Sequence, residues 1–468
     1  MFSAEFWFKA FELIMALSIL VFVHELGHFM WARIFKVGVE KFYLFFDAYN
    51  FAFIRWNKEG LHICDFLHFP RFKNPSDTEY GIGWLPLGGY CAIIGMVDET
   101  HDAEHAEVDR PDAFAKANKF KQFMIMVGGV LNNVLFACLL YICIVWIWGS
   151  DIVEQKNLPN GIYFSEYAHE LGFEDTDLIV AVDGDPIRDL NEFHKSLLLA
   201  NNVTVNRDGK DLTIQLPDTM GTYFLAHKSE FESFFNLNIP FVIGEVMADG
   251  PAGNSGLQTD DHIVAIGVVQ DTLPVQFVST PYIHQVKEML AKNASQTVSI
   301  RYQRGDSVLV AENVTLSDKG TLGVTYSPLA DPAWVTHIDY GFVEAIPAGI
   351  SRGWNTLVDY VRQFKLVFSK EGAKEVGGFG TMGSIMPEEW NWLRFWGLTA
   401  FFSIALAFMN ILPIPALDGG HIMILIIEAI IRRPLSEKLK ERLQMIGFVF
   451  ILLLMVAVNL NDILKLFF

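Results

Sequence analysis

Residues 16 to 35 read ALSILVFVHELGHFMWARIF, which places His24, Glu25 and His28 in a run otherwise apolar enough to cross a bilayer. Two histidines four positions apart project from one face of a helix, with the glutamate next to them. This H-E-x-x-H pattern is typical of a zinc site in which the carboxylate activates water. Hydrogen-bonded histidines in a soluble core helix are the alternative. Because ionisable groups inside a membrane helix cost roughly 2.5 to 3.5 kcal/mol each, the apolar setting favours the functional interpretation.

The composition restricts the class of protein. The chain has 468 residues, of which 51% are hydrophobic and 19% are charged. It is too apolar for an ordinary soluble enzyme and too charged to lie wholly within lipid, so we expect a membrane protein with a large aqueous portion. The net charge of -19 is the opposite of a nucleic-acid binder's basic footprint, so we expect no nucleic-acid partner.

Four stretches are long enough to span a bilayer, which takes about 20 apolar residues. They are residues 11–34, 123–148, 393–414 and 445–467. Lysine and arginine gather between the first two spans and between the last two, so the positive-inside rule places both of these loops in the cytoplasm. Both termini, and the long segment between the second and third spans, are then expected outside the cytoplasm.

The first cytoplasmic loop contains GIGWLPLGGYCAIIGM at residues 81–96, which predicts a short hairpin or looped strand. Beside a membrane-embedded site, such a strand can pair with an extended substrate, although an ordinary surface hairpin fits the sequence equally well. Downstream, HDAEH at residues 101–105 matches the inverted zinc motif H-x-x-E-H. Its acidic surroundings have no apolar face, so we interpret it as a solvated loop.

The long segment contains an internal repeat. Residues 172–182 read GFEDTDLIVAV and residues 256–266 read GLQTDDHIVAI, each with a glycine, an acidic residue five positions later and a strand. A helical pattern and another strand follow each copy, so two copies of one module are expected. The order of turn, strand, helix and strand resembles PDZ domains, which accept a peptide against a sheet edge. A spacer or steric gate is the alternative role.

Three further segments carry weaker patterns. Residues 342–368 predict an amphipathic helix that lies on the membrane surface. Residues 375–385 are too rich in glycine for one regular helix. In the second span, GGVLNN at residues 128–133 is typical of close helix packing, with asparagine hydrogen bonds between helices.

The third span ends in MNILPIPALDGGH at residues 409–421, where two prolines break the helix. Catalytic zinc keeps three protein ligands and leaves one position for water. Asp418, directly after the prolines, is the natural third ligand beside His24 and His28. Glu25 is then free to act as the catalytic base.

Two more polar residues flank this aspartate. Asn410 is a candidate for orienting the scissile carbonyl or stabilising its oxyanion, and a hydrogen bond to the broken helix is the equally weighted alternative. His421 is either a partner of a metal ligand or a plain polar residue at the end of the span.

These motifs resemble the site-2 proteases, and most closely the bacterial regulator-of-sigma-E protease branch with tandem PDZ domains. The resemblance rests on HELGH in the first span, N-x-x-P-x-x-x-x-D-G in the third, the glycine-bearing loop and the PDZ-like insert. It implies that His24, His28 and Asp418 bind zinc, that Glu25 is the catalytic acid and base, and that Asn410 belongs to the broken-helix motif. Residues 81–96 would be a membrane-reentrant β-loop that clamps unwound substrate. The chain departs from the family at Val130, where proline is usual.

The expected fold is an α-helical polytopic membrane protein with four transmembrane helices. Two extracytoplasmic α+β PDZ-like domains are inserted between the second and third spans. The expected boundaries are a first transmembrane helix at 1–35, a cytoplasmic loop with a membrane-associated β-loop at 36–122, a second helix at 123–148, PDZ-like domains at 152–240 and 241–327, a connecting segment at 328–392, a third transmembrane segment at 393–431, a cytoplasmic loop at 432–444 and a fourth helix at 445–468.

The resemblance also implies an activity. We expect an intramembrane zinc metalloprotease of the bacterial cytoplasmic (inner) membrane that hydrolyses a peptide bond within or near the transmembrane segment of a single-pass membrane protein. An anti-sigma factor already trimmed by a site-1-type protease is the typical substrate, and the PDZ-like domains would exclude untrimmed substrates by size. A non-catalytic PDZ scaffold and a zinc transporter are the alternatives. The scaffold leaves three intramembrane ionisable residues without a role, and the transporter explains neither Glu25 beside the two histidines nor the PDZ-like repeat.

Overall fold

The computed structural model describes residues 4–86, 88–96, 110–253, 255–270, 274–326 and 334–467. The HDAEH motif at residues 101–105 lies outside these ranges. The chain divides into two compact units, which we describe separately. The first contains residues 1–149 and 339–468, and the second contains residues 150–338.

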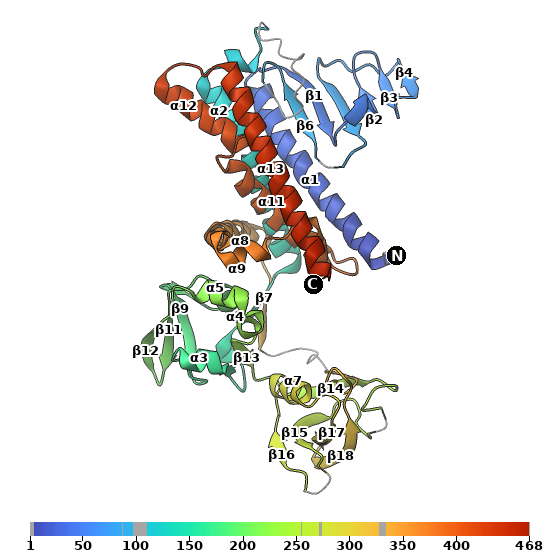
Figure 1. The fold of residues 1–468 in the computed structure, drawn as a ribbon, viewed down its shortest axis with the longest axis vertical. Helices are drawn as coiled ribbons and strands as arrows, with labels where there is room; N and C mark the ends of the chain where they lie inside the picture. Colours follow the sequence, from blue (N-terminus) through green and yellow to red (C-terminus); the bar gives the residue numbers. More distant parts are fainter. Residues whose placement is uncertain are drawn as a thin grey trace. The chain divides into compact units, whose positions relative to one another are not determined.

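The first unit is mainly helical. Four of its helices are long and apolar enough to cross a membrane, and they coincide with the four predicted spans. Figure 1 shows α1, α2 and α11 running alongside one another, in agreement with their packing. The helices of this unit with six or more residues are α1 (Ala4–Ile34), α2 (Lys119–Trp148), α8 (Phe342–Gln363), α9 (Lys370–Glu375), α10 (Phe379–Ser384), α11 (Trp392–Ile411), α12 (Asp418–Ile431) and α13 (Glu437–Phe467).

The predicted third transmembrane segment at 393–431 comprises two helices. α11 ends at Ile411, and α12 begins at Asp418. Proline cannot donate a backbone hydrogen bond, so Pro413 and Pro415 stop the helix. The chain folds back tightly here, because a Cβ on Gly419 would lie 2.1 Å from the carbonyl oxygen of Leu412.

The loop between α1 and α2 contains a six-stranded sheet in the order β4-β3-β2-β5-β1-β6. Its strands are β1 (Val39–Leu44), β2 (Ala52–Trp56), β3 (Leu61–Ile63), β4 (Leu67–Phe69), β5 (Glu79–Gly83) and β6 (Tyr90–Ile93). Of the two alternatives predicted for residues 81–96, a hairpin or a looped strand, the hairpin is wrong, because β1 lies between β5 and β6. Tyr43 of β1 covers Gly81 of β5 so closely that a Cβ on this glycine would lie 2.1 Å from its ring.

The predicted amphipathic helix at 342–368 forms α8 and a short 3-10 turn, Phe364–Phe368. α8 packs against α2 through two glycines. A Cβ on Gly349 would lie 2.5 Å from the backbone of Ile142, and one on Gly353 would lie 3.1 Å from the sulfur of Cys138. Small residues allow such close approach between helices, so α8 is held against a transmembrane helix.

The second unit contains two parts, each with its own core. The strands of the first part are β8 (Ile162–Phe164), β9 (Leu178–Val182), β10 (Asp185–Pro186), β11 (Asn202–Arg207), β12 (Lys210–Gln215) and β13 (Phe235–Leu237), with helices α3 (Glu166–Glu170), α4 (Leu190–Ser196), α5 (Met220–Ala226) and α6 (Lys228–Glu232). The strands of the second part are β14 (Phe241–Val246), β15 (His262–Val268), β16 (Phe277–Ser279), β17 (Thr297–Arg304), β18 (Ser307–Thr315) and β19 (Val324–Tyr326), with helix α7 (Ile283–Lys292). Strands β7 (Ser150–Val153) and β20 (Val335–Ile338) pair with each other where the chain enters and leaves the unit.

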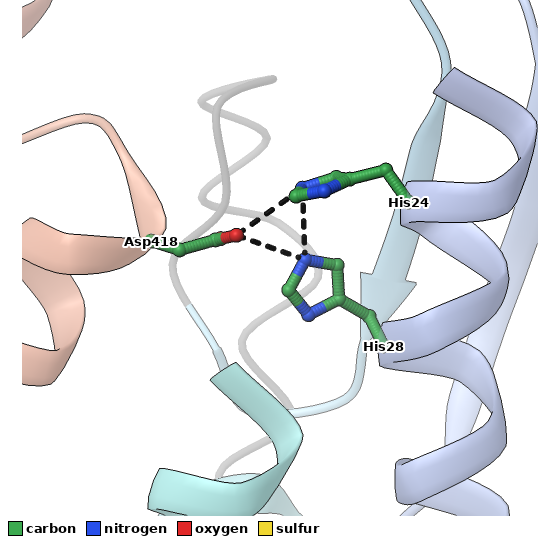
Figure 2. A group of neighbouring side chains, drawn as sticks. All are labelled: His24, His28 and Asp418. Atoms are coloured by element: carbon green, nitrogen blue, oxygen red, sulfur yellow. Dashed lines mark hydrogen bonds and ion pairs between the residues drawn. The ribbon is translucent and has the colours of Figure 1, made fainter. Parts of the chain in front are cut away.

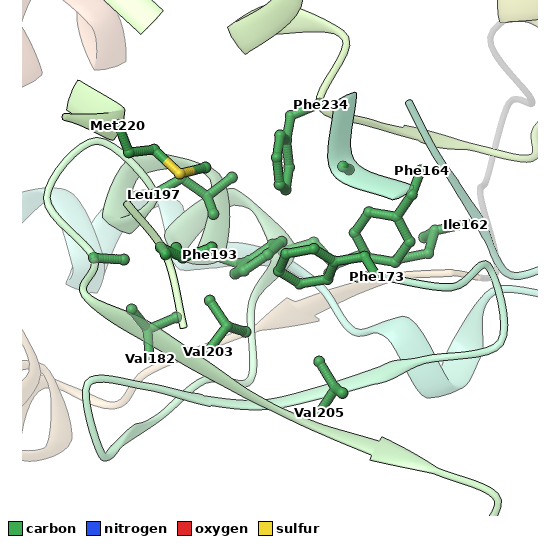
Figure 3. Packing of buried hydrophobic residues seen from close by; sticks show 14 of the residues in the cluster. Ile162, Phe164, Phe173, Val182, Phe193, Leu197, Val203, Val205, Met220 and Phe234 are labelled. Carbon is green, nitrogen blue, oxygen red and sulfur yellow. The ribbon is translucent and has the colours of Figure 1, made fainter. Parts of the chain in front are cut away.

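Aromatic rings fill the first core. Phe164, Phe173, Phe193 and Phe234 are all buried, and Figure 3 shows the four rings converging with aliphatic side chains from β9 and β11. The second core is mostly aliphatic, with Ile263 of β15 buried among residues of β14 and β17. The two hydrophobic clusters share no residue, so each part has its own core.

The acidic residue of each repeat has the same partners. Asp177 pairs with Arg207 at 2.6 Å, and this arginine also donates to the carbonyl of Gly172. Asp261 pairs with Arg304 at 2.7 Å, which likewise donates to the glycine that opens its own repeat. Hydrogen bonds to these carboxylates raise the pKa of both arginines. The two copies of the repeat therefore share their local structure as well as their sequence.

We predict that Phe164→Ala unfolds the first part selectively. Loss of a buried ring costs about 3 to 5 kcal/mol, through lost burial and the cavity left behind. Hydrogen exchange of the full chain should therefore speed up in β11 and stay unchanged in β17. The reciprocal variant, Ile300→Ala, should affect β17 alone. Equal responses of both strands to either change would show that the two cores unfold as one.

Candidate metal centre

α1 supplies the two histidines of the centre. His24 and His28 are one helical turn apart on the buried side of α1, with exposed fractions of 8% and 6%. Their ring centroids are 4.9 Å apart, and their Nε2 atoms are 3.3 Å apart. The helical spacing therefore brings two ligand atoms to one point, as the sequence predicts.

Asp418 meets these histidines from the first residue of α12. Its Oδ2 atom lies 3.1 Å from Nε2 of His24 and 3.4 Å from Nε2 of His28. Figure 2 shows the three side chains pointing toward one another from two helices. Among the described residues, they are the group of three or more His, Cys, Asp and Glu side chains that is close enough to hold a metal ion.

The chemistry of this donor set fits zinc. Two imidazole nitrogens and one carboxylate oxygen are the ligands of many catalytic zinc sites. Tetrahedral zinc, with bonds of about 2.0 to 2.1 Å, holds its ligand atoms roughly 3.3 Å apart, close to the three separations seen here. The Oδ2 atom of Asp418 is buried and has no hydrogen-bond partner within the described chain. A cation bound between the three donor atoms would give this oxygen a partner.

The second nitrogen of each histidine is held by α2. Nδ1 of His28 donates to the backbone carbonyl of Ile125 at 2.9 Å, which leaves Nε2 without a proton and able to bind metal. Nδ1 of His24 lies 3.2 Å from the side-chain amide of Asn133, whose Oδ1 is buried with no partner in the described residues. The oxygen and nitrogen of a side-chain amide are alike in shape, so the Asn133 amide can be flipped to exchange them. Its Oδ1 then accepts a hydrogen bond from Nδ1 of His24, which leaves Nε2 of His24 without a proton and able to bind metal.

Glycines bring α2 this close to α1. A Cβ on Gly27 would lie 2.2 Å from the carbonyl oxygen of Gly128, and a Cβ on Gly129 would lie 2.5 Å from Nε2 of His28. The sequence predicts close helix packing and asparagine hydrogen bonds at residues 128–133, and does not predict that this segment borders the metal centre. One signal in the sequence does point to this proximity. Gly129 and Asn133 are four residues apart, like the two histidines, and so share one face of their helix. With Val130 in place of proline, α2 continues as a helix through this region.

The other predicted residues lie around the donors. Glu25 faces the start of β6, since a Cβ on Gly89 would lie 3.6 Å from its Cγ. Asn410, near the end of α11, places its amide nitrogen 3.2 Å from Nε2 of His24. Its side chain therefore points at the donor set. His421 lies 3.2 Å from the side-chain amide of Gln444 on α13, and is not one of the clustered donors.

Hydrolytic metal chemistry needs a donor set, a nearby carboxylate and a buried setting, and here all three occur among helices able to cross a membrane. The protein thus falls in the class of membrane-embedded metallohydrolases. The model of peptidase family M50 matches residues 12–64 and 66–454. The chain belongs to this family, that of the site-2 proteases.

The chain is similar in sequence to curated relatives over nearly its whole length. The chain is 26% identical to the regulator of sigma E protease of Haemophilus influenzae, across 97% of this chain and 98% of that protein. The regulator of sigma E protease of Salmonella typhi is also 26% identical, over 96% and 97% of the two chains. A Neisseria meningitidis protein, provisionally named a zinc metalloprotease, is 26% identical over 97% and 98%. The protein is therefore a multi-pass membrane zinc metalloprotease.

We predict that Gly129→Ala weakens zinc binding at least about 10-fold, the range for disturbing groups that orient metal ligands. The new methyl group would lie against both imidazoles. Gly397→Ala in α11 is the matched control, because nothing lies within 4 Å of the added methyl group. Zinc competition with a chelator in detergent measures both affinities. Equal affinity for the two variants would contradict the close approach of α2.

Proposed function

We propose that His24, His28 and Asp418 hold Zn²⁺ and that Glu25 is the acid and base that hydrolyses a peptide bond within or near the transmembrane segment of a single-pass membrane protein. The convergence of the three donor atoms, from helices far apart in sequence, is the observation that carries this proposal. Zinc bound by three protein ligands supplies Lewis-acid activation of water and of the peptide carbonyl. Side chains of the protein carry out the remaining steps, which are proton transfer and stabilisation of the oxyanion.

Two features support Glu25 as the general base. It adjoins His24 in sequence and lies next to the strand β6. In our proposal its carboxylate takes a proton from the attacking water and then delivers it to the leaving amine nitrogen. Asn410 directs an amide toward the same point and would donate a hydrogen bond to the oxyanion.

A transmembrane helix has its amide groups bonded internally, so a substrate must unwind before water reaches a peptide bond. β6 lies at one end of the strand order, and in the described residues it pairs with β1 alone. We propose that an extended substrate segment adds to the other edge of β6 by backbone hydrogen bonds. The place of Glu25 beside β6 supports this, since such a segment would run next to the base.

The relatives suggest a biological setting. Two of them are named regulator of sigma E protease. We propose an anti-sigma factor or similar protein as substrate, already trimmed by a site-1-type protease, and a location in the bacterial inner membrane. The distribution of lysine and arginine supports an orientation with both termini and residues 150–338 outside the cytoplasm.

The second unit, in this proposal, consists of two PDZ-like domains at 152–240 and 241–327. Their separate cores and repeated Asp–Arg pairs support the division into two modules. We propose that they act as a size-excluding gate. A bulky folded ectodomain could not pass them, whereas a trimmed stub could.

We predict that Glu25→Gln keeps about one zinc per chain but lowers cleavage of a trimmed single-pass substrate by about 100- to 10,000-fold, because the amide cannot carry the proton. Glu12→Gln is the matched control. Glu12 is buried in the same helix, about 20 Å away along its axis, and should leave both zinc and cleavage unchanged. Undiminished cleavage by Glu25→Gln would refute its role, whereas loss of its zinc would make it a ligand.

We also predict that replacing residues 152–327 by a short linker lets the enzyme cleave an untrimmed substrate at nearly the rate of a trimmed one. The full chain should strongly prefer the trimmed form. Cleavage of both forms is measured side by side in proteoliposomes. If the full chain and the deletion variant cut the untrimmed substrate at the same rate, the size-excluding gate is wrong.

A further inference from the structure

An apolar cavity of about 650 Å³ lies between α1 and the six-stranded sheet. The proposed proteolysis uses the edge of β6, which contributes no residue to the lining of this cavity. The lining residues come from α1, from four strands of the sheet and from the segment after β4, and they include Phe22, Phe42, Ile54, Trp56, Arg71 and Tyr80. Cavities of this size commonly hold small organic ligands.

Aromatic rings form one wall of the cavity. Phe22 of α1 contacts Phe42 of β1 at a centroid distance of 5.9 Å, Phe42 lies 6.3 Å from Tyr80 of β5, and Tyr80 lies 6.0 Å from Trp56 of β2. This wall begins within the bilayer-crossing part of α1 and continues onto the sheet, which lies beside the C-terminal half of that helix in Figure 1. The apolar lining is therefore continuous from the membrane-spanning part of α1 to the sheet.

The segment after β4 adds positive charge to this apolar cavity. Arg71 and Lys73 both line it and are exposed. The indole of Trp56 donates to the carbonyl of Phe72 at 2.9 Å, and the side chain of Asn74 donates to the carbonyl of Thr78 at 2.7 Å. These bonds, with that from the backbone of Asn74 to the carbonyl of Asn57, fix the backbone on both sides of Lys73 beside the cavity.

Nearby acidic groups are already engaged. Asp65 accepts from the backbone of Ala52, and Glu79 accepts from Tyr43 and Asn57. A third carboxylate, Asp77, pairs with Lys58. Neither of the two cations that line the cavity forms an ion pair within the described ranges of the chain. The cavity therefore combines an apolar interior with two cations that have no ion-pair partner among the described residues.

We propose that this cavity binds one anionic phospholipid from the leaflet at the C-terminal end of α1. An acyl chain would lie along the aromatic wall, and the phosphate would meet Arg71 and Lys73. Basic pockets beside transmembrane helices recognise anionic headgroups through such contacts. A lipid fits better than a peptide strand, since the wall begins at bilayer depth and the paired cations match a phosphodiester.

Native mass spectrometry of the full chain in detergent tests this proposal. The wild type should retain one phosphatidylglycerol, and phosphatidylcholine with the same acyl chains should be retained at least 10-fold less. The double variant Arg71→Gln/Lys73→Gln should lose phosphatidylglycerol at least 10-fold, whereas Lys58→Gln, which removes a cation outside the cavity, should match the wild type. Bound zinc reports correct folding of each variant.

A second variant probes the apolar part of the cavity. Ile54→Glu places a carboxylate in the wall and should also expel the lipid, with zinc retained. The proposal fails if the double variant binds phosphatidylglycerol like the wild type, or if phosphatidylcholine binds equally well. It also fails if millimolar inorganic phosphate alone displaces the lipid, which would mean a simple anion site, or if an apolar peptide displaces it, which would mean a polypeptide site.

Discussion

Two imidazoles and a carboxylate at bilayer depth must find every polar partner within the protein, because hydrocarbon offers none. The rest of the membrane unit depends on this constraint. Nδ1 of His28 reaches the carbonyl of Ile125, Nδ1 of His24 reaches Asn133, and their Nε2 atoms converge on Asp418. These contacts join α1, α2 and α12 around one point, so the same interactions position the donors and hold the helices.

Glycine and proline make this convergence possible in different ways. On α2, Gly128 and Gly129 remove the side chains that would otherwise hold α1 away from the histidines. After α11, two prolines end the helix and let α12 begin with Asp418 at the site. Irregular backbone is tolerated inside a membrane where other protein segments cover it. The broken helix brings Asp418 to the two histidines, because an unbroken helix would place this aspartate elsewhere.

The donor set was predictable because its signals are local. The i, i+4 spacing of His24 and His28 and the aspartate after two prolines are visible in short stretches of sequence. The contact of Asn133 with His24 was harder to predict, since its spacing from Gly129 defines one face of α2 but not which helix that face meets. The six-stranded sheet was also missed. Its strands have three to six residues, and the pairing of β1 with both β5 and β6 is set by contacts across the fold.

X-ray absorption at the zinc edge of the purified, zinc-loaded full chain tests the central claim most directly. We predict light-atom ligands with two imidazoles, at bond lengths of about 2.0 to 2.1 Å, and a changed spectrum in Asp418→Asn. Sulfur ligands at about 2.3 Å would place the metal at cysteines instead. Such a spectrum, or one with no imidazole scattering, would contradict a zinc centre built from α1 and α12.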